Sequence, residues 1–209
     1  MSILELRNVQ YSYDQKKNVL KNINAQMERG KFYAILGPSG CGKTTLLSLL
    51  GGLDSPSQGT ILFDGQDIEK LGLAKHRKNN IAFIFQSYNL IDYLTPKENV
   101  ALTSKLPPLP ILQLVGLTTE EIKRNVLKLS GGQQQRVAIA RALASDAKVI
   151  LADEPTGNLD EKTAAEITSI LKECAHQMQK CVIVVTHSSD LAKQADVVLQ
   201  LKKGLLQEA

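Results

Sequence analysis

The first residues that could do chemistry lie between positions 37 and 44, which read G-x-x-x-x-G-K-T. An apolar run, Phe32–Leu36, precedes them, and residues 45–50 favour a helix. A strand, a glycine-rich loop and a helix in this order form a phosphate cradle, because backbone N–H groups and the helix dipole converge on one anion. Lys43 would reach the outer phosphates, and Thr44 would offer its hydroxyl to Mg²⁺. We therefore expect nucleotide binding rather than a glycine turn without function.

Two neighbouring carboxylates, Asp153 and Glu154, follow an apolar run at residues 149–152. Such a run predicts a buried strand, and the carboxyl ends of parallel strands form the ligand-binding edge of an α/β sheet. There Asp153 would hold Mg²⁺ directly or through water, and Glu154 would orient or deprotonate an attacking water. The alternative is that both carboxylates merely end a strand, but this alternative is weak beside a phosphate loop.

Gln86 and His187 each follow a further apolar run, at residues 81–85 and 181–186. The neutral amide of Gln86 could contact Mg²⁺ or water without changing the charge of the site. The imidazole of His187 could contact the γ-phosphate or the attacking water. A single histidine at a strand end is, however, more often an ordinary polar residue.

Ser130, Gly131, Gly132 and Gln133 precede a strongly helical stretch at residues 134–144. A serine and two glycines at a helix N-terminus form a second anion-binding surface, far in sequence from the first. The alternative makes Ser130 a simple N-cap, which leaves the two glycines in a helical stretch unexplained. We therefore predict two phosphate-binding edges in one chain.

The rest of the sequence indicates the elements that position these residues. Apolar runs alternate with helical patterns in the second half, which is typical of a parallel α/β sheet. A period-two pattern at residues 3–9 predicts a half-buried strand. The basic residues 75–78 are interpreted as a turn. We also expect strands at residues 19–27 and 60–65, a hairpin at 196–206, and helices at 111–117, 120–129 and 163–178.

The composition is that of a globular protein. Of 209 residues, 43% are apolar and 22% are charged, with a net charge of +4, which is enough for a real core. The mild charge is interpreted as a solvated surface, and we expect no nucleic acid as partner. We assign residues 1–209 to one domain, with a core at about 1–98 and 130–209 and a small helical lobe at 99–129 that carries Pro107, Pro108 and Pro110.

The cellular location is also predicted from composition. Three cysteines at no metal-ligand spacing argue for a reducing compartment without disulfides. The N-terminus has no signal-peptide pattern, and no stretch approaches the roughly 18 consecutive apolar residues of a spanning helix. We therefore expect a cytoplasmic protein that reaches a membrane only through a partner.

In order and spacing, these motifs resemble the ATP-binding cassette (ABC) transporter ATPases, and the L-S-G-G-Q sequence at residues 129–133 is highly specific for that family. The resemblance covers nearly the whole chain. It implies an α/β fold of the P-loop NTPase type, with a parallel-sheet core, an N-terminal antiparallel β subdomain and a short inserted helical subdomain. It also implies ATP and Mg²⁺ as cofactors and an ATPase reaction.

The family's site residues carry over to the matching positions. The implied catalytic residues are Glu154, His187 and Gln86, and the implied metal ligands are Thr44, Gln86 and Asp153. The residues implied to bind the nucleotide are Tyr13, Gly37, Pro38, Ser39, Gly40, Cys41, Gly42, Lys43, Thr44, Thr45, Ser130, Gly131, Gly132, Gln133 and Asp160. Tyr13 would stack on adenine, and Tyr11 is the competing candidate for that role.

The resemblance also accounts for the two phosphate-binding edges. Two copies of the family's cassette pair head to tail, so residues 130–133 of one copy would close over ATP held by the other. Residues 51–54, 130–136 and 154–160 look like the branch of MacB, LolD and FtsE. That branch serves permeases for peptides, lipoproteins and drugs, or acts in cell division. The short lobe at 99–129 is similar to that of peptide-exporter ATPases of streptococcus-like bacteria.

We therefore expect a homodimeric exporter ATPase at the inner face of the cell membrane, driving a separate permease. The permease would contact residues 88–91, with Ile91 and Tyr93 either as apolar contacts or as core. One alternative is an FtsE-like regulator that moves no substrate. Another is a soluble ABC ATPase of repair or translation, which is disfavoured because prolines replace coiled-coil heptads between Gln86 and Ser130.

Overall fold

The computed structural model of the chain describes residues 2–13, 18–104 and 107–209. The strands are β1 (Ser2–Tyr11), β2 (Leu20–Glu28), β3 (Phe32–Leu36), β4 (Gln58–Phe63), β5 (Gln66–Asp67), β6 (Ile81–Ile84), β7 (Val149–Asp153), β8 (Cys181–Thr186), β9 (Val197–Lys202) and β10 (Leu205–Glu208). The helices are α1 (Lys43–Leu50), α2 (Ile68–Leu71), α3 (Leu73–Asn80), α4 (Pro96–Ala101), α5 (Pro108–Leu114), α6 (Thr119–Lys123), the 3₁₀ turn η1 (Val126–Lys128), α7 (Gly131–Leu143), α8 (Glu161–His176) and α9 (Ser189–Ala192).

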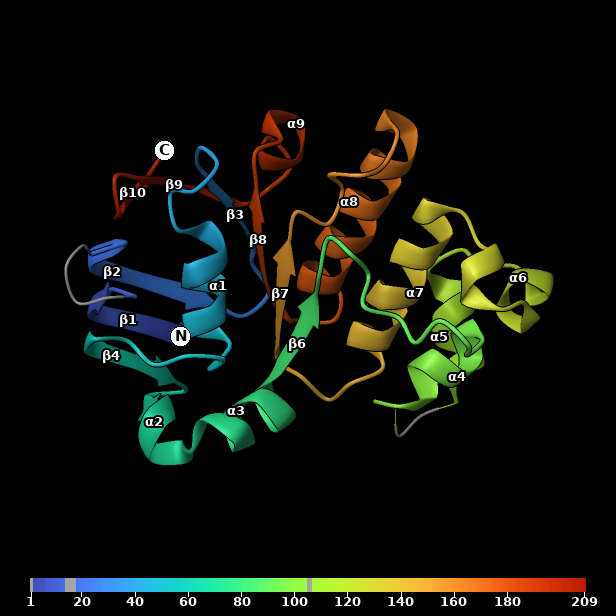
Figure 1. Cartoon of the computed structure of the whole chain (residues 1–209), viewed down its shortest axis with the longest axis horizontal. Helices are drawn as coiled ribbons and strands as arrows, with labels where there is room; N and C mark the ends of the chain where they lie inside the picture. The colour runs from blue at the N-terminus through green and yellow to red at the C-terminus, as the bar shows by residue number, and fades with distance from the viewer. Residues whose placement is uncertain (1, 14–17, 105–106) are drawn as a thin grey trace.

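Within the described residues these strands form two sheets. The order β2-β1-β4-β5 is antiparallel throughout. In the order β10-β9-β3-β8-β7-β6 all neighbours are parallel except β10, which pairs with β9 as the predicted hairpin. Figure 1 shows the antiparallel sheet at one end of the molecule and helices α4, α5 and α6 at the other. The predicted fold class is confirmed.

The parallel strands are apolar without alternation because both of their faces are covered. Val182 and Val184 of β8 belong to the core formed with α7 and α8. Ile183 and Val185 belong to the core shared with α1 and the antiparallel sheet. On each face, apolar surface is therefore removed from water, and this burial stabilises the fold by about 25 cal/mol for each Å². This double burial holds the strand ends, and the residues after them, in fixed positions.

The lobe before α7 consists of short helices, and the end predicted for one of these helices is wrong. α6 ends at Lys123, whereas the sequence pattern predicted a helix through residue 129. Asn125 explains the break, because its side chain accepts from the Leu127 N–H and donates to the Asp92 carbonyl oxygen, both at 2.9 Å. An asparagine that bonds locally in this way competes with the helix and begins a new turn.

The interpretation of residues 75–78 as a turn is also wrong, because they lie in α3. His76 of this helix is fully buried, and its Nε2 lies 3.1 Å from the Leu50 carbonyl oxygen at the end of α1. Burial lowers the pKa of His76, so the ring is neutral at pH 7. α3 therefore packs against α1 through a histidine that the basic run concealed.

Among the described residues, the chain has no helix both long and apolar enough to cross a membrane.

Candidate nucleotide site

The predicted site segments meet at one edge of the parallel sheet. The order β3-β8-β7-β6 brings the carboxyl ends of these strands side by side. The phosphate loop follows β3, while His187, Glu154 and Gln86 follow β8, β7 and β6. Ligands of parallel α/β sheets bind at this edge, because the loops there extend from strands that the core holds in place.

The loop between β3 and α1 depends on its glycines. Gly40 and Gly42 have φ angles of 73° and 104°, which glycine adopts without steric cost. A Cβ atom on Gly37 would lie 2.5 Å from the carbonyl oxygen of Leu201, so a side chain there would collide with β9. α1 begins at Lys43, and the N–H groups of its first turn have no partners within the helix. The loop is therefore shaped to bind an anion.

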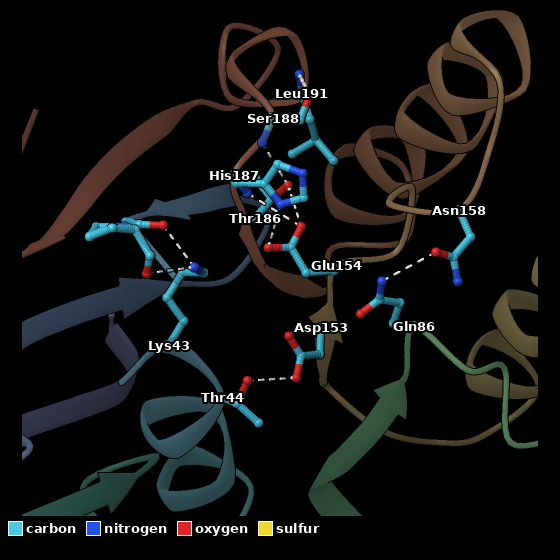
Figure 2. A network of polar contacts seen from close by, with 12 residues as sticks. Lys43, Thr44, Gln86, Asp153, Glu154, Asn158, Thr186, His187, Ser188 and Leu191 are labelled. Carbon is cyan, nitrogen blue, oxygen red and sulfur yellow. Dashed lines mark hydrogen bonds and ion pairs between the residues drawn. The ribbon is translucent and has the colours of Figure 1, made fainter. Parts of the chain in front are cut away.

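The ammonium group of Lys43 folds back over this loop. Its Nζ donates to the carbonyl oxygens of Gly37 at 2.7 Å and of Pro38 at 3.2 Å. Figure 2 labels Lys43 and marks its two contacts with dashed lines. Hydrogen bonds between charged partners are stronger than bonds to neutral carbonyls. A phosphate group entering the loop would therefore compete well for this ammonium.

A cavity of about 760 Å³ opens over the loop, within the range of roughly 300–1,000 Å³ that small-molecule sites occupy. It is lined by Tyr13, Val19, Ser39, Gly40, Gly42, Lys43, Thr44, Thr45, Gln86, Asp153, Glu154 and His187. Val19 is the lining residue that the sequence did not indicate, because an apolar residue before a strand carries no chemical signal. The structure thus brings seven of the fifteen predicted nucleotide-binding residues to one space, together with the predicted catalytic and metal-binding side chains of Gln86, Asp153, Glu154 and His187.

Thr44 and Asp153 form the polar pair at the floor of the site. Thr44 Oγ1 donates to Asp153 Oδ2 at 2.9 Å (Figure 2). Burial raises the pKa of Asp153, and the nearby Glu154 charge adds to this, while the Thr44 bond and Lys43 oppose it. A carboxylate whose ionised form is penalised by burial gains from a cation beside it.

Glu154 is held between β7 and the end of β8. Its Oε1 lies 3.0 Å from Nδ1 of His187, whose side chain is 70% exposed. Its Oε2 accepts from the Thr186 hydroxyl at 3.0 Å and from the His187 N–H at 3.3 Å. Figure 2 shows the His187 ring against the carboxylate. The glutamate and the histidine therefore form a contact pair, which the sequence analysis did not predict.

Gln86 and Asp160 each form hydrogen bonds with residues that come after Asp153 and Glu154 in the chain. Gln86 Nε2 donates to Asn158 Oδ1 at 3.3 Å. Asp160 caps α8 by accepting from the Thr163 N–H and hydroxyl, at 3.0 and 2.7 Å, and these bonds lower the pKa of Asp160. Asp160 is not among the described residues that line the cavity. Its role in nucleotide binding remains a prediction.

The two tyrosines differ in how much of their rings a ligand could reach. Tyr13 is 71% exposed and its hydroxyl lies 2.7 Å from Thr45 Oγ1 at the cavity. Tyr11 is 7% exposed, and its hydroxyl bonds Asp54. This bond, with burial, raises the pKa of Tyr11 to about 12. Tyr11 is thus a core residue, which leaves Tyr13 as the accessible candidate for stacking.

Residues 130–133 are not part of this cavity in the described chain. Ser130 and Gln133 form a capping box at the start of α7, with bonds of 2.8 and 3.3 Å. A Cβ on Gly132 would lie 2.5 Å from Thr163 Cγ2, and one on Gly131 would lie 2.9 Å from the Tyr88 hydroxyl. Close packing therefore also explains the two glycines. The structure does not bring the two predicted phosphate-binding edges together within one chain.

Comparisons with known proteins agree with the fold and the motifs. Residues 20–157 match the family described as ABC transporter. The chain is 45% identical to the uncharacterized ABC transporter ATP-binding protein YclH of Bacillus subtilis, over 98% of this chain and 95% of YclH. It is 42% identical to the macrolide export ATP-binding/permease protein MacB of Bdellovibrio bacteriovorus, over 98% of this chain but only 33% of MacB.

The solved structures of MJ0796, a cassette of Methanocaldococcus jannaschii, are also similar. Its dimeric structure has a TM-score of 0.88 at 38% identity, covering 99% of this chain and 97% of that one. A second dimer, in a post-hydrolysis state bound to ADP and Pi, has a TM-score of 0.85 at 37% identity with the same coverage. The MacB match supports the predicted branch. The chain therefore belongs to the ABC transporter family and is one of its ATP-hydrolysing, ATP-binding proteins.

Proposed function

We propose that this chain is the ATPase subunit of an exporter, working at the inner face of the cell membrane as a homodimer bound to a separate permease. The observation that carries the proposal is the pairing of Glu154 with His187 beside the phosphate loop at one sheet edge. The name of MacB describes a macrolide exporter that contains both ATP-binding and permease parts. Peptides, lipoproteins or drugs are the proposed cargo.

The residues at the floor of the site fit Mg²⁺. Thr44 and Asp153 offer a hydroxyl and a carboxylate oxygen 2.9 Å apart, and oxygen is the ligand that Mg²⁺ prefers. The Gln86 amide nitrogen is engaged by Asn158, so its oxygen remains for the ion or its water. Such a set is typical of an ion whose other ligands are nucleotide phosphates and water. When bound, Mg²⁺ would neutralise charge that develops on the phosphates.

The remaining groups suit the hydrolysis of ATP. Glu154 would take a proton from a water molecule as the water oxygen bonds the γ-phosphorus and the bond to the ADP oxygen breaks. His187 would orient the γ-phosphate or this water from the exposed side of the carboxylate. Lys43 and the N–H groups of the loop would stabilise the charge on the phosphoryl oxygens. Tyr13 would stack on the adenine.

The second anion-binding edge would act on a neighbouring copy. Ser130 and the glycines after it lie outside the chain's own cavity, so in a head-to-tail pair they would close over the ATP of the partner. A ligand that binds the closed pair more tightly than the open one shifts the population toward the closed pair. ATP binding and release would in this way move the permease.

We place the permease contact beside the segment that follows Gln86. Tyr93 is 80% exposed there, whereas Ile91 is half-buried and its N–H donates to Asn99 Oδ1. A second cavity of about 670 Å³ adjoins this segment, because Arg141, which lines it, donates to the carbonyl oxygens of Tyr88 and Asn89. Its other lining includes Arg77, Lys78, Phe83 and Leu102. A permease segment with apolar and acidic side chains would complement it.

The test is reconstitution with a candidate permease, which would be sought among the genes next to the one that encodes this chain. Vesicles containing both proteins should export a labelled macrolide, peptide or lipoprotein only with Mg²⁺ and ATP, and Glu154→Gln should stop export. Tyr93→Asp should abolish co-purification with the membrane protein, whereas the exposed Leu114→Asp in α5 should not. ATP turnover stimulated by the membrane protein without export would favour the regulator instead. Failure to bind any membrane protein would contradict the proposal.

A further inference from the structure

Thr186 is a buried polar residue at the end of β8 that no motif marked. It is 0% exposed, and its hydroxyl lies between the Glu154 carboxylate and the backbone of the next turn. The Ser188 N–H is 3.1 Å from Thr186 Oγ1, and Glu154 Oε2 is 3.0 Å away. A buried hydroxyl with both of its functions engaged is a fixed group rather than a free rotor.

The direction of both bonds follows from the chemistry of the partners. A backbone N–H can only donate, so Thr186 Oγ1 accepts from Ser188. The hydroxyl hydrogen is therefore left for the Glu154 carboxyl oxygen Oε2, which accepts it. Ser188 also begins α9 as its N-cap, so the turn that orients Thr186 is itself anchored. Figure 2 shows this chain of contacts from Ser188 to Glu154.

The backbone of Glu154 requires such an anchor. Glu154 has a φ of 44°, a left-handed conformation that is unusual for a residue other than glycine. Its N–H still donates to the Val185 carbonyl oxygen at 3.0 Å, as though β7 continued. Backbone and side chain of Glu154 are thus both tied to the end of β8. A residue in a sparsely populated conformation persists only where its surroundings hold it.

The two carboxylate oxygens consequently have different surroundings. Oε2 is occupied by the buried Thr186 hydroxyl and by the His187 N–H, whereas Oε1 faces the largely exposed His187 ring. We infer that Thr186 is a positioning residue, whose hydroxyl fixes Oε2 of Glu154 so that Oε1 is presented to the attacking water. This inference depends on the proposed role of Glu154 as the base.

The test compares side chains that differ by the hydroxyl. Thr186→Val keeps the shape of threonine, and Thr186→Ala and Thr186→Ser differ by one oxygen atom. We expect the valine and alanine variants to lose about ten-fold or more in kcat, since a hydrogen bond to a charged group is removed, with little change in the KM for ATP. Serine should restore most of kcat. The matched control is Thr168→Val, because Thr168 is also buried but donates to the Ala164 carbonyl oxygen within α8, and this variant should keep the native kcat.

Measurements in a Glu154→Gln background separate this inference from the proposed function. Turnover has already stopped there, so Thr186→Val should leave ATP binding and dimer accumulation as they are in Glu154→Gln alone, because the group it positions has been replaced. Wild-type kcat in Thr186→Val or Thr186→Ala, beside an inactive Glu154→Gln, would overturn the role of Thr186 alone. The same would follow from a serine variant as slow as alanine. A Glu154→Gln variant with the native rate would instead remove the base itself, and with it both inferences.

Discussion

Lys43 Nζ lies 2.7 Å from the carbonyl oxygen of Gly37, the first residue of the loop to which Lys43 itself belongs. The side chain that we propose to carry the charge for the phosphates is thus held over the loop by neutral carbonyl oxygens. Its position is prepared by the backbone, while its stronger partner would arrive with the nucleotide.

Replacing Lys43 by alanine should weaken ATP binding by at least roughly 100-fold, because two or more charge-assisted hydrogen bonds to phosphate are lost. Titration with a fluorescent ATP analogue measures this directly. Lys202→Ala, which removes an exposed lysine from β9, serves as the control and should bind normally. Full affinity in Lys43→Ala would contradict the assignment of the loop.

Substitution at Tyr13 and Tyr11 should separate binding from stability. Tyr13→Ala should raise the KM for ATP about ten-fold, since stacking on a base contributes roughly 1–3 kcal/mol, with no change in Tm. Tyr11→Phe should leave KM unchanged and cost about 1 kcal/mol of stability, because its hydroxyl makes a part-buried hydrogen bond to Asp54. Steady-state kinetics and thermal melts distinguish the two. A normal KM in Tyr13→Ala together with a raised KM in Tyr11→Phe would instead make Tyr11 the stacking residue.

Glu154→Gln should bind ATP, stop turnover and accumulate dimer, because the amide keeps the shape of the side chain and cannot take a proton from water. Size-exclusion chromatography with light scattering measures the dimer. Adding a bulky Ser130→Trp change should return this variant to monomer, if residues 130–133 close over the partner's ATP. A Glu154→Gln protein that stays monomeric at saturating ATP would argue against the shared site.

Asp153→Asn should stabilise the chain in the presence of EDTA while abolishing Mg²⁺-dependent turnover. Burial raises the pKa of Asp153 above its usual value. The carboxyl group therefore holds its proton more tightly in the folded state than in the unfolded state. The ionised carboxylate therefore costs stability at pH 7, and this cost fades as the pH falls through the raised pKa toward the unfolded value of about 3.9. Tm should be a few degrees higher in the variant at pH 7, with a shrinking difference in acid. A lower Tm at pH 7 would contradict this.

The sequence was a good guide where the chemistry is local. The phosphate loop between β3 and α1 could be predicted because strand, glycines and helix N-terminus lie next to one another in the chain. The strand carrying Asp153 and Glu154 could be predicted because a sheet covered on both faces requires continuous apolar residues. The α3 helix could not, because its residues are mostly polar and its buried group is a histidine.

Other features were decided by residues far apart in the chain. The end of α6 depends on Asn125 meeting the carbonyl oxygen of Asp92. The difference between Tyr11 and Tyr13 depends on Asp54, which binds only one of two tyrosines with similar local sequence. The role inferred for Thr186 depends on Glu154 turning left-handed at the end of the neighbouring strand.

The amino-acid sequence by itself therefore determined the family, the fold class and the candidate residues that we propose to bind phosphate and metal, because these follow from residue types at short spacings. Tertiary structure alone decided which of those residues share a cavity, which tyrosine a ligand can reach and which buried hydroxyl holds the carboxylate. Those properties arise from contacts across neighbouring strands and helices, and no local pattern specifies the neighbour that a buried side chain will meet.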